Sequence, residues 1–441
     1  MGVAVLVVAA PGPLVDVRPA QVSAGAGEEL VLSTVRPAPT GPDGRTLTVV
    51  RFGATAAEVE RSSLDLSAEA AWWDAGHGLW LLDGRGLLRL PARTRIAALE
   101  TPLAWMGPTT PAQAGLVVDL DRDSRAELLV WAGGAVHGFG EDGTSWGSIP
   151  APAAGSLSAT AALGGQAMSA TVQAPPVAVA DVDGDGVEDV LVIHPDTVAA
   201  FLSGPGTLGQ RTQRWPLPPI LAASQADAEA GWTIGARWAD LTGDGRADLL
   251  ASRVDSSGGM AATEAELQLW VGTGTGSGLA APQVVRTGAG SIEVFPVDLD
   301  GDGDLDVLVP QVRIDVGALA QAVLSQSFDA ELVAYPMEDG RLGSPRPMHR
   351  VRVSLDGEQA AWSLFEDLSG DGRPDLAYIT DQRLQCFAAL PDRIGLADMP
   401  WVDVPVPFGV DNLWSVDLTG DGVAELVGWS PGESRLLVVR L

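Results

Sequence analysis

Short apolar runs recur along the chain, and polar residues, glycine or proline separate them. Near residue 180 the runs are Val177–Ala180, Val190–Ile193, Val198–Leu202 and Gln213–Leu217, with an acidic turn between the first two. Short runs rich in β-branched residues and bounded by turn residues are typical of β-strands. The longest helical candidate, residues 316–326, has room for only about two or three turns. The pattern therefore predicts an all-β protein built from units of four strands.

The acidic turn reads Asp-Val-Asp-Gly-Asp-Gly-Val-Glu-Asp over residues 181–189, and we number its residues as loop positions 1 to 9. Acids at positions 1, 3, 5 and 9 are expected to converge on one point, while glycine at position 6 permits a tight turn. Loops of this oxygen-rich, flexible kind bind Ca²⁺. An EF-hand loop differs, because it closes with Glu at its twelfth residue and lies between helices. This loop is expected to join two strands.

The acidic loop is a repeat. Stronger copies begin at Asp240, Asp298, Asp367 and Asp417, and a weaker copy begins at Asp119. From Asp119 onward, successive copies start 62, 59, 58, 69 and 50 residues apart. About four short strands fit into each period, which is the signature of a β-propeller blade.

Two degenerate copies precede these loops. One covers residues 72–82, with Asp74 at the expected place, and the other covers residues 14–33, with Asp16 as its marker. Eight copies then span the chain with a mean period of about 57 residues. The last copy lacks a strand and residues 3–9 supply one, so the N-terminal strand is expected to close the ring and hide both edges.

The predicted fold is thus a single propeller domain over residues 1–441, with eight blades favoured. The alternative has seven blades and treats part of residues 1–66 as an added cap. The approximate blade ranges are 10–66, 67–107, 108–172, 173–228, 229–288, 289–355, 356–409 and 410–441, the last closed by 3–9.

Six loops are candidate metal sites. The two strongest offer four carboxylates each, from Asp181, Asp183, Asp185 and Asp189 and from Asp298, Asp300, Asp302 and Asp306. Three loops with a hydroxyl at position 3 are expected to bind more weakly: Asp240, Thr242, Asp244 and Asp248; Asp367, Ser369, Asp371 and Asp375; Asp417, Thr419, Asp421 and Glu425. In the sixth, formed by Asp119, Asp121, Asp123 and Glu127, Ser124 replaces the glycine, and its occupancy is left open.

About five or six Ca²⁺ ions are therefore expected, in a structural rather than a catalytic role. The alternative is that hydrogen bonds to the Asp side chains hold each turn without metal. Repulsion among the closely packed carboxylates favours a bound cation.

The Asp-x-Asp-x-Asp-Gly-x-x-Asp loops resemble FG-GAP/VCBS repeats, the family of integrin α-chain propellers and of several bacterial and fungal propeller lectins. The resemblance covers roughly Leu14–Leu441, although the Phe-Gly and Gly-Ala-Pro signatures are mostly absent and the nearest match is Arg51–Gly53. It implies that the main-chain carbonyl at position 7 completes the metal shell, from Val187, Arg246, Asp304, Arg373 and Val423. The family serves adhesion, sugar binding and scaffolding and forms modules of larger enzymes and toxins, so the resemblance leaves the biological role open.

The composition narrows the classes of partner and chemistry. A net charge of −30 argues against nucleic acid or an anionic membrane as the main partner. No apolar run approaches the ~20 residues that span a bilayer. The single cysteine, Cys386, excludes an internal disulfide and is expected to be a small core residue. The four histidines lie in different repeats and no Gly-x-Ser-x-Gly elbow is present, so we expect a non-enzymatic protein.

Residues 1–8 lack the basic start of a signal peptide. An extracellular, periplasmic or cell-surface location is nevertheless expected, because millimolar Ca²⁺ suits the weaker sites. A cytoplasmic location stays open.

The strand order predicts where a partner binds. In a four-stranded meander the acidic turns share one face, and the longest insertions, residues 150–176, 221–231, 252–264 and 311–326, emerge on the other. Loops on a rigid frame commonly carry binding. We therefore expect a protein or glycan partner on the face opposite the metal loops, with Trp232 as the first candidate contact. The leading hypothesis is a recognition, adhesion or scaffolding module; the alternatives are a lectin proper and a subunit of a larger toxin, secretion or enzyme assembly.

Overall fold

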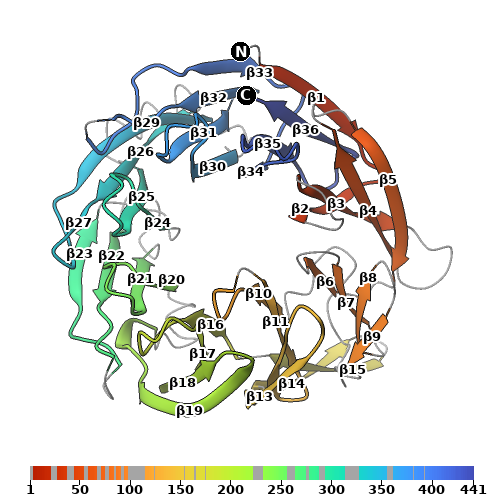
Figure 1. Ribbon diagram of the computed structural model, residues 1–441, viewed down its shortest axis with the longest axis vertical. Helices are drawn as coiled ribbons and strands as arrows, with labels where there is room; N and C mark the ends of the chain where they lie inside the picture. The colour runs from red at the N-terminus through yellow and green to blue at the C-terminus, as the bar shows by residue number, and fades with distance from the viewer. Residues whose placement is uncertain are drawn as a thin grey trace.

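Four-stranded antiparallel sheets are arranged as a ring in the computed structural model (Figure 1). The structure describes residues 3–20, 27–36, 44–53, 58–66, 71–74, 79–83, 86–90, 94–97, 115–123, 125–152, 154–162, 165–173, 175–221, 232–255, 264–274, 278–287, 294–312, 327–354, 361–380, 382–391 and 393–441. Within this part of the chain there are eight four-stranded sheets, so the prediction of an all-β propeller of antiparallel blades is confirmed.

The strands of the first four blades follow one another along the chain. They are β2 (Leu14–Ala20), β3 (Glu29–Arg36), β4 (Gly44–Phe52) and β5 (Glu58–Leu66); β6 (Ala71–Asp74), β7 (Leu79–Asp83), β8 (Gly86–Leu90) and β9 (Thr94–Ala97); β10 (Gly115–Val118), β11 (Glu127–Ala132), β12 (Ala135–Phe139) and β13 (Ser145–Pro150); β16 (Val177–Ala180), β17 (Asp189–Ile193), β18 (Thr197–Gly204) and β19 (Thr207–Pro216).

The other four blades continue the same order. They are β20 (Trp232–Ala239), β21 (Asp248–Asp255), β22 (Glu264–Trp270) and β23 (Gln283–Thr287); β24 (Phe295–Val297), β25 (Asp306–Val312), β26 (Ser327–Tyr335) and β29 (Arg346–Ser354); β30 (Ala361–Glu366), β31 (Asp375–Thr380), β32 (Arg383–Phe387) and β33 (Val402–Pro405); β34 (Asn412–Val416), β35 (Glu425–Trp429), β36 (Arg435–Arg440) and β1 (Ala4–Ala9).

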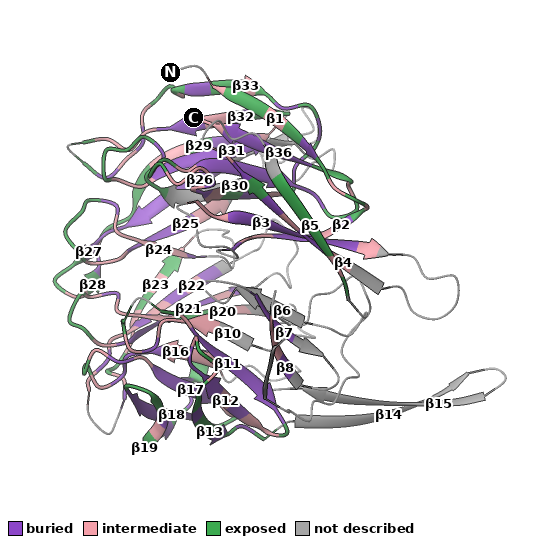
Figure 2. Ribbon diagram, turned by 45° about the vertical axis from the view of Figure 1, so that its right-hand side comes forward, coloured by how far each residue is buried: buried purple, intermediate pink, exposed green. Residues whose placement is uncertain are grey.

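The N-terminal strand completes the last blade, as predicted. β1 pairs antiparallel with β36, in register from Ala4 opposite Arg440 to Ala9 opposite Arg435. Figure 2 shows that most residues of β1 are exposed, whereas most residues of β36 are buried. The main-chain N–H of Leu14 also donates to the carbonyl of Glu433 at 2.6 Å, which ties the first blade to the last.

Apolar side chains pack mainly between neighbouring blades. One cluster, for example, joins Leu14 and Leu30 of the first blade to Leu418 and Val427 of the last. The residue at position 2 of every acidic loop belongs to such a cluster: Leu120, Val182, Leu241, Leu299, Leu368 and Leu418. The alternation of apolar runs and acidic loops therefore places each loop against an inter-blade core.

Additional strands lie outside the blades. β14 (Ala154–Ala162) and β15 (Gly165–Gln173) form a separate antiparallel hairpin between β13 and β16 (Figure 1). A smaller hairpin, β27 (Met337–Glu338) and β28 (Arg341–Leu342), interrupts the connection from β26 to β29. The repeat pattern predicts only a plain insertion for the first segment and gives no signal for the second hairpin.

The prediction that Asp16 marks the acidic turn of the first copy is wrong. Asp16 lies inside β2, which continues to Ala20, and its carboxylate forms an ion pair with Arg18 at 2.7 Å. If Asp16 were position 1 of the loop, the strand would end at residue 15, but β2 ends five residues later, at Ala20. β3 begins at Glu29, just as β17 begins at Asp189, the position 9 residue of its loop. Glu29 is thus the position 9 residue of this degenerate copy.

Helices are scarce. The described residues contain one short 3₁₀ turn, η1 (Pro219–Leu221), and no helix that meets the length and apolarity of a membrane span. The candidate turns at 316–326 fall outside the described residues, as do the centres of the insertions at 221–231 and 252–264.

Candidate metal centre

Each acidic loop joins the first strand of a blade to its second strand. In the five loops with glycine at both positions 4 and 6, the backbone has positive φ at these positions, for example +77° at Gly184 and +88° at Gly186. Glycine adopts this region without the steric cost that a Cβ atom brings. In the Asp119 loop Arg122 occupies position 4 with φ 58°. The glycine of position 6 was expected from the sequence, whereas the same requirement at position 4 emerges only from the structure.

The carboxylate at position 1 holds the turn together. Asp181 Oδ1 accepts the main-chain N–H of Gly184 at 2.7 Å, and its Oδ2 accepts the N–H of Gly186 at 2.8 Å. Asp298, Asp367 and Asp417 accept the equivalent hydrogen bonds in their own loops. These are the Asp-mediated turn bonds of the metal-free alternative. A carboxylate has about four lone-pair sites, so these bonds leave acceptor capacity for a cation.

The carboxylate at position 9 links the loop to the third strand. Asp189 is 1% exposed; its Oδ2 accepts the N–H of Val182 at 3.0 Å and its Oδ1 accepts the N–H of Ser203 at 2.8 Å. Asp248, Asp306 and Asp375 make the same pair of contacts, to position 2 or 3 of the loop and to the end of the third strand. Position 9 therefore fixes the loop to the blade.

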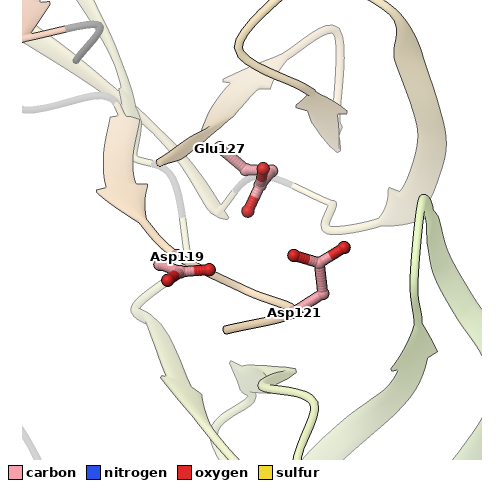
Figure 3. A group of neighbouring side chains, drawn as sticks. All are labelled: Asp119, Asp121 and Glu127. Atoms are coloured by element: carbon pink, nitrogen blue, oxygen red, sulfur yellow. The ribbon is translucent and has the colours of Figure 1, made fainter. Parts of the chain in front are cut away.

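Carboxylate oxygens converge in three loops. Groups of oxygens within 4.8 Å of one another come from Asp119, Asp121 and Glu127, from Asp181, Asp183 and Asp189, and from Asp298, Asp300 and Asp302. Figure 3 shows the first group, whose three carboxylates come from the two strand ends and the loop and surround a common space.

The prediction that all four acids converge needs correction. Asp185, at position 5, directs its Oδ1 to the N–H of Val187 at 2.9 Å and lies outside the convergent group of its loop. In the Asp298 loop it is position 9, Asp306, that lies outside the group. Main-chain N–H groups also donate to acids that belong to the groups, such as Asp189 and Asp302, so these hydrogen bonds alone do not decide which acid is left out.

Position 3 carries the strongest indication of a missing partner. Oδ1 of Asp183 and Oδ1 of Asp121 are buried and accept no hydrogen bond, and each belongs to a convergent group. A buried polar oxygen without a partner is costly. An all-oxygen donor set is what hard divalent cations prefer. The residues of these loops therefore fit a cation such as Ca²⁺.

Burial raises the pKa of several of these carboxyl groups. It raises the pKa of Asp189 and of Glu127 to about 7, and that of Asp306 to about 6. Burial, followed by the charge of Asp185, also raises the pKa of Asp183. Desolvation and like charges both disfavour the ionised form of these carboxyl groups.

Arginine contacts to the acids of two loops, those that begin at Asp181 and Asp417, were not predicted. Arg211 of β19 contacts Asp183 Oδ2 at 3.0 Å, and Arg440 of β36 contacts Asp421 Oδ2 at 2.7 Å. Arg122 of one loop reaches Glu188 of the next at 3.1 Å. These residues come from outer strands or neighbouring blades, and the repeat pattern gives no signal for them.

The structure describes only the main chain of Trp232, the predicted partner contact. Trp232 is the first residue of β20 and pairs with Asp255, but its side chain lies outside the described residues. Other tryptophans do wedge blades together: the rings of Trp215 and Trp238, from adjacent blades, are 6.4 Å apart in an edge-on contact. Trp414 and Trp401 differ, with 45% and 43% of their surface exposed.

Comparison with known proteins gives a family match and distant structural similarities. The model of the FG-GAP-like repeat matches residues 181–251 and 259–309. No curated protein matches the sequence.

Among solved structures, an Agrocybe aegerita lectin that recognises non-reducing terminal N-acetylglucosamine has 13% identity and a TM-score of 0.45, with 98% of this chain and 86% of that chain covered. The β-propeller domain of Myceliophthora thermophila Cps50 (Swd1) has 11% identity and a TM-score of 0.35, with 93% and 99% covered. The NanB sialidase of Streptococcus pneumoniae has 8% identity and a TM-score of 0.33, with 98% and 69% covered. Similarity at this level carries no argument about the function of this chain.

The family match covers three of the acidic loops whose geometry is described above, those that begin at Asp181, Asp240 and Asp298. The same loops recur in the remaining blades, joined to the same strands. The chain is thus a β-propeller of four-stranded antiparallel sheets that carries FG-GAP-like repeats.

Proposed function

We propose that this chain is a non-enzymatic recognition module whose propeller is stabilised by Ca²⁺ in the acidic loops. The observation that carries the proposal is the buried, unpaired Oδ1 of Asp183, whose carboxylate converges with those of Asp181 and Asp189. Asp121 repeats the arrangement in another blade. A bound cation would supply the missing positive charge and accept these oxygens as ligands.

The residues of each loop would divide the work. The carboxylate at position 1 shapes the turn and faces the ion. In the Asp119 and Asp181 loops position 3 supplies an oxygen that the protein itself leaves unpaired. In the Asp181 loop position 9 connects the surroundings of the ion to the third strand. The apolar residue at position 2 lies in the core between blades, so an ordered loop supports the packing of one blade on the next. The role of the metal is therefore structural.

Removal of Ca²⁺ tests this first part. EGTA treatment of metal-loaded protein should lower the melting temperature, because a ligand at 100 times its Kd stabilises a fold by about 2.7 kcal/mol per site. A variant with Asp183→Asn and Asp300→Asn removes the position 3 carboxylates of two loops and should show a smaller effect of EGTA. Asp196→Asn, which changes an exposed acid outside the loops, is the matched control. An unchanged melting temperature after EGTA, with metal loading verified beforehand, would refute the role of Ca²⁺.

The strand order supports a partner site on the face opposite the metal loops. The acidic loops join first to second strands, whereas residues 256–263 join β21 to β22 and residues 313–326 join β25 to β26, at the other ends of these strands. Residues 222–231 connect β20 to the preceding blade on that same side. A rigid ring that presents several long connections on one face suits binding of a protein or glycan.

Binding assays distinguish the candidate functions. A glycan array with and without Ca²⁺ tests the lectin alternative, and a pull-down from the source organism tests a protein partner or membership of a larger assembly. Deletion of residues 222–231 together with 256–263 leaves β20, β21 and β22 intact. If this deletion leaves every detected interaction unchanged, the partner site is elsewhere.

A further inference from the structure

The acidic loops of consecutive blades are joined by main-chain hydrogen bonds. The N–H at position 8 of one loop donates to a carbonyl at position 1 or 2 of the preceding loop. Ala247 donates to Asp181 at 2.6 Å, Glu188 donates to Leu120 at 2.6 Å, and Leu305 donates to Leu241 at 2.9 Å. The contact recurs where the ring closes, because Glu28, one residue before Glu29, donates to Asp417 at 3.0 Å.

Side chains follow the same route between loops. Arg122 of the Asp119 loop contacts both Glu188, at 3.1 Å, and Asp181, at 3.8 Å, in the next loop. Gly184 of the Asp181 loop faces the side chain of Arg246 in the following one. The loops on this arc are therefore in direct contact and cannot rearrange independently.

The donor at position 8 belongs to the same peptide group as the carbonyl at position 7. Calcium loops of this kind use the position 7 carbonyl as a ligand. The peptide unit is planar and its C=O and N–H are conjugated. A cation on the carbonyl of Arg246 would withdraw electrons from that peptide and make the N–H of Ala247 a stronger donor. The hydrogen bond that this N–H makes to Asp181 would then be stronger, in the way that linked hydrogen bonds polarise one another.

We propose that Ca²⁺ binding is cooperative along the arc of loops that begin at Asp119, Asp181, Asp240 and Asp298, and that the peptide between positions 7 and 8 transmits the coupling. A cation in one loop strengthens the bond to position 1 or 2 of the preceding loop and so orders the start of that loop for its own cation. Coupling is reciprocal, so each site raises the affinity of the other. The proposal rests on the proposed binding of Ca²⁺ and adds the regulation of those sites.

The chain contains its own contrast. In the Asp367 loop position 8 is Pro374, which has no N–H and cannot donate to the loop before it. The arc of coupled sites is therefore expected to end between the Asp298 and Asp367 loops. Pro374 also shows that an acidic loop of this chain accommodates proline at position 8, with Asp367 still accepting the N–H of Gly370 at 2.7 Å.

Ala247→Pro tests the coupling, because it removes one N–H and reproduces at position 8 the proline that the Asp367 loop carries naturally. The Asp181 loop is disabled separately by Asp183→Asn with Asp185→Asn, and the two changes are then combined. Glycine-selective NMR follows the amide signals of Gly186 and Gly245 during a Ca²⁺ titration, so the affinity of each loop is read by itself. Comparing the four proteins as a double-mutant cycle cancels the electrostatic effect of losing two carboxylates.

Disabling the Asp181 loop should lower the Ca²⁺ affinity that is read at Gly245, and the decrease should be larger when Ala247 is present than in the Ala247→Pro variant. We expect the two decreases to differ by about fivefold, which is at the lower end of typical coupling. An equal change in both backgrounds overturns the coupling while Ca²⁺ binding stands. If neither glycine signal responds to Ca²⁺, the proposed binding itself fails and the coupling with it. Leu305→Pro makes the same cut between the Asp240 and Asp298 loops and gives an independent result if Ala247→Pro does not fold.

Discussion

Truncation of Leu241 tests how closely a metal loop depends on the core between blades. Leu241 occupies position 2, is 0% exposed, and packs with Leu250 and Val307 of its own and the following blade. Its N–H donates to Asp248 Oδ2 at 3.0 Å, so the residue fixes the loop through both its side chain and its main chain. Leu241→Ala keeps the main-chain bond and removes only the side-chain packing.

The expected cost follows from that burial. A leucine truncated to alanine in a core that cannot collapse costs about 2.7–5.0 kcal/mol. Antiparallel strands on both sides hold the walls of this site, so we expect a value in the upper part of that range, about 3–5 kcal/mol. The loop should also bind Ca²⁺ more weakly, because it loses the anchor that holds position 2 in place.

Urea unfolding, followed by tryptophan fluorescence in EGTA and in excess Ca²⁺, measures both effects. The matched control is Leu47→Ala, which is 2% exposed and lies in β4, in a buried cluster that contains no residue of an acidic loop. Both variants should lose similar stability in EGTA, whereas only Leu241→Ala should gain less from Ca²⁺ than the unaltered protein. A loss below about 1 kcal/mol, or an equal gain from Ca²⁺ in both variants, would contradict the reasoning.

Three further outcomes are expected. Arg440→Gln removes the guanidinium group that lies 2.7 Å from Asp421. Calorimetry should then show a Ca²⁺ affinity of that loop that is about threefold to tenfold higher. The control Arg435→Gln should leave the affinity unchanged, because its partner Glu433 lies outside the loop. Burial lowers the pKa of His349, so the folded state prefers the neutral ring and loses stability as the pH falls below about 6.5. In His349→Phe the midpoint of urea unfolding should therefore change less between about pH 7 and pH 5 than it does in the unaltered protein. An equal change of the midpoint in both proteins would count against this account. Burial raises the pKa of the Cys386 thiol to about 12, so iodoacetamide at about pH 8 should label the protein only after denaturation, and fast labelling of the native protein would be inconsistent with its burial.

Much of the fold could be predicted from the sequence because its signals are local. Strand, acidic turn and strand lie within about fifteen residues, and the same pattern returns in every blade, so even copies without acids keep the apolar spacing. The degenerate first copy shows the limit of this reasoning. Once the acids are lost, only the apolar pattern remains, and it does not reveal that β2 extends beyond Asp16 to Ala20.

The candidate site could be predicted less completely, because part of it comes from remote residues. The positions of the acids indicated a cation loop, and three loops do bring acids together. The second contact of Asp189, to Ser203 at the end of the third strand, depends on how the blade folds back. The approach of Arg211 and the bond from Ala247 to Asp181 likewise depend on blade packing, and neither leaves a periodic trace in the sequence.

The pairing of β1 with β36 determines how the ring responds to mechanical load. Ala4 lies opposite Arg440 and Ala9 lies opposite Arg435, so the first residue of β1 and the last residue of β36 are at the same end of the strand pair. Tension applied through Val3 and Leu441 therefore separates the strands one pair at a time, as in a zipper, instead of shearing all the hydrogen bonds together. The ring would open at a low force when it is pulled from these points, although it resists thermal unfolding through every blade.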